Sequence, residues 1–374
     1  MKNMFCLLLA MLMVFSASVV SFADEGENTS VTFEISEDTE FGAVSIDASP
    51  EEFAVFDAQL GDSIDAHFSN GYVLEDIPYY DGYYTRTKFP LLVNYPGTYI
   101  HLAFSSGDPL WKVSGCTVGD TVTLTVRERG KYLDTQNAMA SVYVDDRAAF
   151  GSDEIFANFR PMTGGKLREN YLFRGASPVN NLHLRAGTVN ALLEENAVAY
   201  VLDLADTEEK LTEYMAGEDF TSGYAAELFE SGNAALLGLS AAYRSDAYKC
   251  SLAEGLRDMS RHTGPYYIHC TEGKDRTGFV CMLLEALAGA SYDEIEYDYM
   301  KTYDNYYGIS TESEPEKYEA LKELRLYDML WWLLDVPDGT VLDGMDFTKA
   351  AESYLLSAGM TESEITELKT AIMQ

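Results

Sequence analysis

The sequence predicts two domains, an all-β domain (a sandwich or small barrel) followed by an α/β domain with a central, mainly parallel sheet flanked by helices. Three observations predict this. The chain has 374 residues, more than one hydrophobic core usually needs. Its first part reads as short strands separated by turn dipeptides. After "DDRAAFGSDE" (145–154), strand-like and helix-like segments alternate. We place the boundary near Gly151, between a β domain at 24–150 and a second domain at 151–374.

The first 23 residues read as a secretory signal peptide. Lys2 precedes an apolar run from Phe5 to Val20, and small residues in Ser21-Phe22-Ala23 stand where a signal peptidase reads. The run is shorter than the roughly 18 residues that favour a membrane span. We therefore expect cleavage before Asp24 and a secreted, extracellular protein.

Charge and cysteine content exclude several classes of function. The formal net charge is −35, which repels nucleic acid, so we expect no nucleic-acid partner and only local attraction of an anionic substrate. Four cysteines follow the signal peptide, and their spacing matches no zinc pattern. With five histidines and no ligand-like pair among them, we expect no metal site and no cofactor. The four cysteines are Cys116, Cys250, Cys270 and Cys281.

The first domain carries β signals from Val31 to Val144. "TVTLTV" (121–126) alternates with period two, and "SVYV" (141–144) is rich in strand-forming residues. Turn dipeptides suited to tight hairpins predict an antiparallel arrangement; they are Asn70-Gly71, Asp81-Gly82 and Pro96-Gly97. The stretch 72–99 holds seven tyrosines. We read them mainly as packing residues, and the alternative is a face that binds a cell-surface polymer.

The second domain is predicted from alternating segments. The expected strands are "YLFRGA" (171–176) and "AVAYVLDL" (197–204), and the expected helices are 183–196 and 245–262. Residues 205–245 look irregular and are predicted to form a mobile cover. Three further helical segments close the chain, at 291–307, at 315–335 and as a pair at 346–372 that divides near Gly359.

A cysteine lies between a strand and a helix in the middle of this domain. "PYYIH" (265–269) reads as a buried strand, and "GFVCMLLEALAGA" (278–290) is apolar nearly all round, as in a buried helix. Such a strand-to-helix turn directs several backbone N–H groups into one concavity at the positive end of the helix. We call residues 270–277 the cysteine loop.

The residue types in the cysteine loop suit phosphoryl transfer. Cys270 is expected to be a thiolate nucleophile that forms a phosphocysteine. The amides of residues 271–276 can hold phosphate oxygens, and Arg276 adds a planar fork. We expect Thr277 to donate its hydroxyl to the sulfur and His269 to orient the loop. The predicted phosphate-binding residues are Thr271, Glu272, Gly273, Lys274, Asp275, Arg276 and Thr277. For Lys274, the alternative is a solvated loop charge.

The stretch "HCTEGKDRTG" (269–278) resembles the loop of bacterial lipid-phosphatase-like protein tyrosine phosphatases, and the resemblance extends over most of 153–372. Arg174 in "LFRGASP" matches that family, while Gly175 replaces its usual serine. Asp203 in "VLDLADTEEK" also matches, but Ala205 stands where the family has arginine. The resemblance implies a cysteine-dependent phosphatase acting on phosphotyrosine, dual-specificity or phosphoinositide substrates. Residues 24–150 lie outside it.

The leaving group of such a reaction needs a proton from a carboxylic acid. We rank three candidates in the order Asp275, Asp203 and Asp206. The resemblance implicates the loop aspartate in activity. Asp203 is alternatively a cap or loop anchor.

Two other functional readings stay open at this point. One is a phytase-like phosphatase acting on inositol phosphates, and the other is a surface-binding protein with weak or no turnover. Among the remaining cysteines, Cys281 falls within the apolar helix and reads as packing. Cys250 is a candidate disulfide partner that would protect Cys270.

Overall fold

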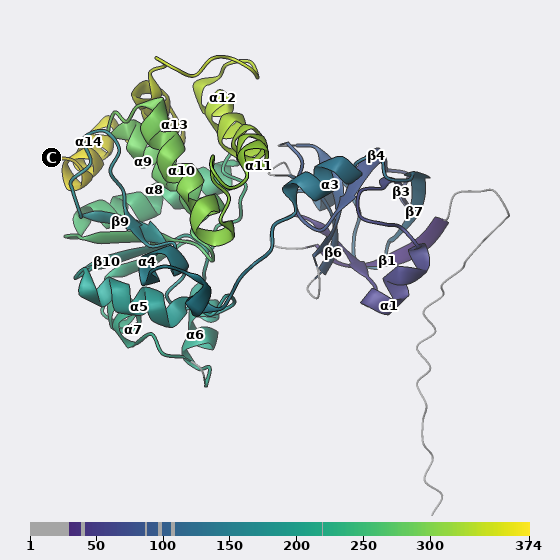
Figure 1. Ribbon diagram of the computed structural model, residues 1–374, viewed down its shortest axis with the longest axis horizontal. Coiled ribbons are helices and arrows are strands. Elements are labelled where there is room, and N and C mark those ends of the chain that lie inside the picture. Colours follow the sequence, from purple (N-terminus) through teal and green to yellow (C-terminus); the bar gives the residue numbers. More distant parts are fainter. Residues whose placement is uncertain (1–29, 39–41, 87, 96–98, 106–108, 219) are drawn as a thin grey trace, which may run out of the picture.

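The computed structural model describes residues 30–38, 42–86, 88–95, 99–105, 109–218 and 220–374. The predicted signal peptide and the Pro96-Gly97 turn lie outside these residues. Figure 1 shows a β barrel on one side and a sheet with many helices on the other, joined by an extended segment. Within the described ranges, no helix is both long enough and apolar enough to cross a membrane.

The N-terminal region is a closed barrel of seven strands in the order β1-β2-β6-β5-β4-β3-β7. Of the two β architectures predicted, the barrel is therefore the one observed. Apolar residues of β7, such as Val122 and Leu124, alternate toward a core that also takes Phe53 and Phe56. The strands are β1 (Ser30–Asp38), β2 (Val44–Asp47), β3 (Ser63–Phe68), β4 (Val73–Tyr80), β5 (Pro90–Tyr95), β6 (Tyr99–Phe104) and β7 (Thr121–Glu128). The short helices are α1 (Pro50–Phe53), η1 (Ala54–Phe56) and α2 (Leu110–Ser114).

The two predicted turns around β4 have different outcomes. Asn70-Gly71 joins the antiparallel strands β3 and β4, with Gly71 at φ 90°, so this hairpin is confirmed. Asp81-Gly82 is not a hairpin, because β4 and β5 pair in parallel. Parallel neighbours need a crossing connection. Residues 81–86 and 88–89 therefore leave the barrel as a loop, and we call these residues the β4–β5 loop.

The predicted strand at 141–144 is wrong. These residues follow α3 (Leu133–Met139) and run extended toward the second domain without joining either sheet. Val142 is 79% exposed, whereas the Tyr143 side chain is held by partners in the second domain. The strand-forming residues at 141–144 therefore do not pair in a sheet, and Tyr143 among them contacts the second domain instead. We call residues 140–146 the linker.

The C-terminal region contains a five-stranded sheet in the order β11-β10-β12-β9-β8. Its strands are parallel except β8, which pairs antiparallel with β9. Successive residues of β12 enter different hydrophobic clusters, with Ile268 packing among residues of α8 and α9, and Tyr267 among residues of α5 and α7. The strands are β8 (Arg160–Pro161), β9 (Leu172–Gly175), β10 (Tyr200–Asp203), β11 (Ala234–Leu236) and β12 (Tyr266–His269).

Helices surround this sheet. The helix that follows the cysteine loop is buried at every residue from Thr277 to Leu287, as its apolar sequence predicts. The helices are η2 (Arg147–Ala149), α4 (Asp153–Phe156), α5 (Ala186–Glu195), α6 (Glu208–Met215), α7 (Gly223–Glu230), α8 (Asp246–Arg261), α9 (Asp275–Leu287), α10 (Tyr292–Tyr307), α11 (Pro315–Leu321), the π-helical η3 (Lys322–Tyr327), α12 (Asp328–Leu334), α13 (Phe347–Ser357) and α14 (Glu362–Ile372).

The prediction of an irregular cover at 205–245 is wrong for about half of its length. This segment forms α6, α7 and β11. Thr207 caps α6, and the amide of Ala225 in α7 donates to the Asn190 side chain of α5 at 2.9 Å. Because β11 pairs with β10, the segment extends the sheet instead of covering it.

Candidate active site

The cysteine loop lies where three parallel strands end together. In the sheet register His269 stands beside Asp203 of β10 and beside Gly175 of β9. Cys270 follows His269 directly, and α9 begins at Asp275. The chain thus passes from the carboxyl edge of a parallel sheet into a helix N-terminus, a place where backbone N–H groups point at a ligand.

Close backbone contacts fix the loop from below. Gly273 has φ 72°, and a Cβ there would meet the carbonyl oxygen of Gly175 at 2.2 Å, so the position requires glycine. Arg174 donates to the Gly273 carbonyl at 2.9 Å, and the Asn158 amide donates to that of Glu272 at 3.2 Å. The predicted site residue Arg174 is fully buried and supports the loop.

A buried charge cluster holds these supporting residues. Asp298 pairs with Arg174 and, at 2.7 Å, with Arg160, whose guanidinium also donates to the Asn158 side chain at 2.7 Å. Burial alone would raise the pKa of Asp298, but the two arginines outweigh it and hold the pKa below its usual value. Burial raises the pKa of neighbouring Glu285 well above its usual value. Sequence reasoning missed Arg160, Asn158, Asp298 and Glu285.

The loop amides and Arg276 are the groups of the predicted anion cradle. Among the hydrogen bonds of the described residues, none has a backbone N–H of residues 271–274 as donor. Arg276 donates to the Leu239 carbonyl at 2.9 Å and to the Thr271 hydroxyl at 3.2 Å, and its fork has further donors. Burial lowers the pKa of Arg276, but the nearby Cys270 and Asp275 outweigh it and raise the pKa. The guanidinium therefore carries its charge beside the sulfur.

The two residues that flank this cradle are fully buried. His269 Nδ1 lies 3.2 Å from the carbonyl oxygen of Cys270, and burial lowers the pKa of this histidine to about 4, so the ring is neutral near pH 7. Among the residues that the structure describes, the buried Thr277 hydroxyl has no hydrogen-bond partner. The expected bond from Thr277 to the sulfur is therefore not formed.

Lys274 is paired within the loop and is not a solvated charge. Its ammonium lies 2.7 Å from Glu272 and donates to the Tyr307 hydroxyl at 3.0 Å. Burial lowers the pKa of Lys274, but Glu272, Tyr307, Tyr143 and Asp275 together outweigh burial and raise the pKa well above its usual value. Tyr143 of the linker also donates to Glu272, at 2.9 Å. Sequence reasoning missed Tyr143 and Tyr307, whose contacts depend on the fold.

The three acid candidates occupy different environments. Asp275 is half-exposed and lines the main cavity. Asp203 is fully buried and accepts the amides of Ala205 and Asp206, at 2.8 Å and 3.1 Å, so it anchors the turn after β10. Burial raises the pKa of Asp203 to about 6. Burial and the nearby Asp203 carboxylate together raise the pKa of Asp206 to about 7. Of the three candidates, Asp275 is the one that lines the cavity.

Replacing Asp206 with asparagine should change how stability depends on pH. The pKa of Asp206 is about 7 in the folded state, and its usual value is 3.8. Between these two pH values the folded state therefore keeps a proton on Asp206 that the unfolded state has lost. Stability is therefore lost as pH rises from about 4 to about 7. Asparagine mimics the protonated acid, so the variant should gain stability over wild type by roughly 2–4 kcal/mol at pH 8 and little at pH 4. Urea denaturation at both pH values checks this, and an equal difference at the two would contradict it.

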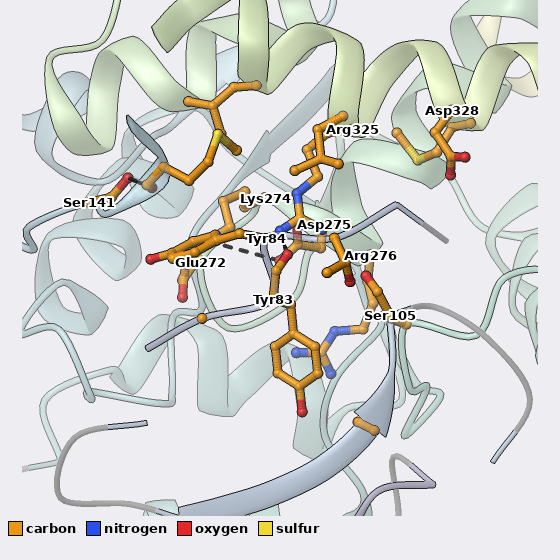
Figure 2. A pocket seen from close by; sticks show the side chains of 18 of the residues that line it. Tyr83, Tyr84, Ser105, Ser141, Glu272, Lys274, Asp275, Arg276, Arg325 and Asp328 are labelled. Carbon is orange, nitrogen blue, oxygen red and sulfur yellow. Dashed lines mark hydrogen bonds and ion pairs between the residues drawn. The ribbon is translucent and has the colours of Figure 1, made fainter. Parts of the chain in front are cut away.

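A cavity of about 550 Å³ opens above the cysteine loop. Figure 2 shows Glu272, Lys274, Asp275 and Arg276 of the loop together with residues from both domains. Cys270 is 3% exposed and is not among the lining residues. Tyr248 of α8 does line the cavity, and its buried hydroxyl has no hydrogen-bond partner among the described residues. Sequence reasoning missed Tyr248, which stands on an ordinary amphipathic helix.

Within the described part of the chain, Cys250 and Cys281 form no disulfide. Cys250 is exposed and Cys281 is buried within α9. Burial raises the pKa of Cys281 above its usual value, which keeps this thiol protonated.

Comparison with known proteins gives one family. A model described as "Tyrosine phosphatase family" matches residues 156–374, and the β barrel lies outside the match. No curated protein matches the chain. One matching solved structure is titled "Crystal structure of uncharacterized conserved protein from Thermotoga maritima", at 17% identity and a TM-score of 0.23. The match covers 25% of this chain and 35% of that one, so the chain spans about a third of that protein's length.

Proposed function

Because the chain belongs to the tyrosine phosphatase family, we propose that it hydrolyses phosphate monoesters through a phosphocysteine formed on Cys270. The observation that carries the proposal is the loop that joins β12 to α9, where amides, a charged guanidinium and a cysteine come together. In this proposal residues 151–374 are the catalytic domain, of α/β type around the mainly parallel sheet. The mature protein is a secreted enzyme.

The reaction proceeds in two displacements. The Cys270 thiolate attacks phosphorus, the bond from phosphorus to the leaving oxygen breaks, and Asp275 gives that oxygen its proton. Water then attacks the phosphocysteine, its proton passes to the Asp275 carboxylate, and the sulfur–phosphorus bond breaks. Inorganic phosphate and the thiolate result. In both steps the amides of the cysteine loop and Arg276 hold the phosphate oxygens.

The cavity is better suited to one phosphate group than to several. Three of its lining residues carry Lys or Arg side chains and four carry carboxylates, so the cavity has no excess of positive charge. Lys274 is already paired with Glu272. This balance favours a phosphotyrosyl or other singly phosphorylated substrate over an inositol polyphosphate. A phosphoinositide with a single phosphomonoester remains within the proposed substrate class.

A protein that binds without turnover is the second candidate. It is favoured by Ala205, which stands where the family resemblance calls for arginine. In that case the function of the protein would be the binding of a cell-surface polymer by the β barrel. Absence of aryl-phosphate hydrolysis by the purified protein between about pH 4.5 and 7.5 would favour this candidate.

Phosphate release from a set of substrates tests the proposed function. The set is p-nitrophenyl phosphate, O-phosphotyrosine, a phosphatidylinositol monophosphate in vesicles, and inositol hexakisphosphate. We expect release from the aryl phosphates and little from the hexakisphosphate. Release from the hexakisphosphate alone would instead support the phytase-like alternative.

The same assay tests the role of Asp275. Replacing it with asparagine should lower kcat about 100- to 1,000-fold for O-phosphotyrosine, whose leaving group needs a proton. The loss should be much smaller for p-nitrophenyl phosphate, because nitrophenolate leaves without one. Asp246→Asn, at the first position of α8 and outside the cavity, is the matched control. Equal losses on both substrates would contradict the role.

A further inference from the structure

The cavity above the cysteine loop is built by both domains. The β4–β5 loop contributes Tyr83 and Tyr84, and barrel strands contribute Tyr95 and His101. The linker adds Tyr143. Figure 2 shows Tyr83 and Tyr84 in the same cavity as Lys274, Asp275 and Arg276. The domain outside the family match therefore reaches the site where the family's chemistry takes place.

The β4–β5 loop is fastened to the C-terminal domain at its backbone and by charge. Arg325 of the π-helical η3 donates to the carbonyl oxygen of Tyr83. Arg86 pairs with Glu323 of the same element at 2.7 Å. The Tyr84 ring packs against both the barrel core and the core of the C-terminal domain. These contacts position the loop over the cavity without a disulfide.

The linker connects the barrel to the cysteine loop directly. The Tyr143 hydroxyl donates to Glu272 at 2.9 Å and lies 3.3 Å from the Tyr95 hydroxyl of β5. The Tyr143 ring stacks on His183 at 4.3 Å. Contacts thus connect Tyr95 of a barrel strand, through Tyr143, to Glu272, which lies two residues after Cys270.

The two ends of a phosphate monoester need different surroundings. The phosphate group needs the amides and the guanidinium of the cysteine loop, which are all supplied by the C-terminal domain. The organic group needs apolar or aromatic surface, and tyrosine offers rigid contact area at low entropic cost. The aromatic side chains that the barrel places in the cavity meet this second need. Tyr83 and Tyr84 are both half-buried on the fastened loop, and Tyr84 is the one that also packs against the core of the C-terminal domain, so Tyr83 is the candidate for contact with a substrate.

We propose that the β barrel forms one wall of the substrate pocket and that Tyr83 is a specificity-determining residue that contacts the organic group of the substrate. The proposal rests on the proposed function, because it assumes that phosphate occupies the cysteine loop. It makes the barrel part of the substrate site and not a separate binding module.

Equilibrium binding to the full chain carrying Cys270→Ser tests the proposal without turnover. Calorimetric titration compares inorganic phosphate, which needs only the cysteine loop, with O-phosphotyrosine, which also needs the wall. Adding Tyr83→Ala should weaken O-phosphotyrosine binding about 5- to 10-fold and leave phosphate binding unchanged. Tyr83→Phe keeps the ring and should restore most of the affinity. Tyr297→Ala, the same change at a residue 65% exposed and outside the cavity, is the matched control.

The possible outcomes separate the two claims. If phosphate binds but Tyr83→Ala leaves O-phosphotyrosine affinity unchanged, the proposal that the barrel contacts the substrate is overturned. Phosphate binding by the cysteine loop is then still supported. If both ligands weaken equally, Tyr83 only supports the fold and the specificity role is overturned. If neither ligand binds to the Cys270→Ser chain with Tyr83 intact, the proposed function is overturned. The proposed role of the barrel, which depends on that function, is overturned as well.

Discussion

Replacing Cys270 with serine is expected to lower kcat for aryl phosphates by about 10,000-fold or more. The sulfur lies beside a charged guanidinium at the N-terminus of α9, where the loop amides and Arg276 would hold the phosphate that the sulfur attacks. A serine hydroxyl keeps its proton in the same place and is a far weaker nucleophile. Such a loss corresponds to at least about 5.5 kcal/mol in the activation barrier. Initial rates with p-nitrophenyl phosphate check the expectation.

Two further measurements tie this loss to chemistry. Cys250→Ser changes an exposed cysteine outside the cavity and should keep full activity. Rapid acid quenching of the wild-type reaction should trap phosphate on the peptide that contains Cys270. The proposed mechanism is wrong if Cys270→Ser keeps more than about a tenth of the rate, since a nucleophile cannot be removed at so small a cost.

The cysteine loop was predictable because its signals are local. Residues 265–290 contain the buried strand, the turn and the buried helix in sequence, and each has its own periodicity. The supporting residues were not predictable in this way. Asp298 meets Arg174 across 124 positions of the chain, and Tyr143 meets Glu272 across 129. No single-sequence pattern connects residues so far apart.

The wrong predictions of local structure in the two domains have a related cause. An Asp-Gly pair indicates a turn but does not say which strands pair on either side of it. At Asp81-Gly82 the next strand lies parallel to β4, so the turn opens a crossing loop. At residues 205–245 a helix signal was present, since Thr207 precedes Glu208 and Glu209 as an N-cap precedes an acidic first turn. The helices there are only eight residues long, which weakens the periodic signal.

Replacing Asp298 with alanine is expected to destabilise the protein by about 3–5 kcal/mol. Asp298 is the carboxylate between Arg160 and Arg174, and all three side chains are largely buried. Its removal leaves two guanidinium groups in the interior without that partner. The free energy of unfolding, measured by urea denaturation at pH 7, checks the expectation. Asp298→Asn, which keeps the size and some hydrogen bonds, should cost less.

The same variant links stability to the site. Arg174 bonds both Asp298 and the Gly273 carbonyl, so a shifted Arg174 also loosens the cysteine loop. Phosphate affinity of folded Asp298→Ala should therefore fall as well, whereas Asp304→Ala is the matched control on the same helix. Asp304 pairs with Lys301 at the surface at 2.6 Å, and such pairs contribute at most about 1 kcal/mol. Similar losses of stability and of phosphate affinity from Asp298→Ala and Asp304→Ala would contradict the proposed support of the loop. Only the buried pair leaves a desolvated charge without its partner when the carboxylate is removed.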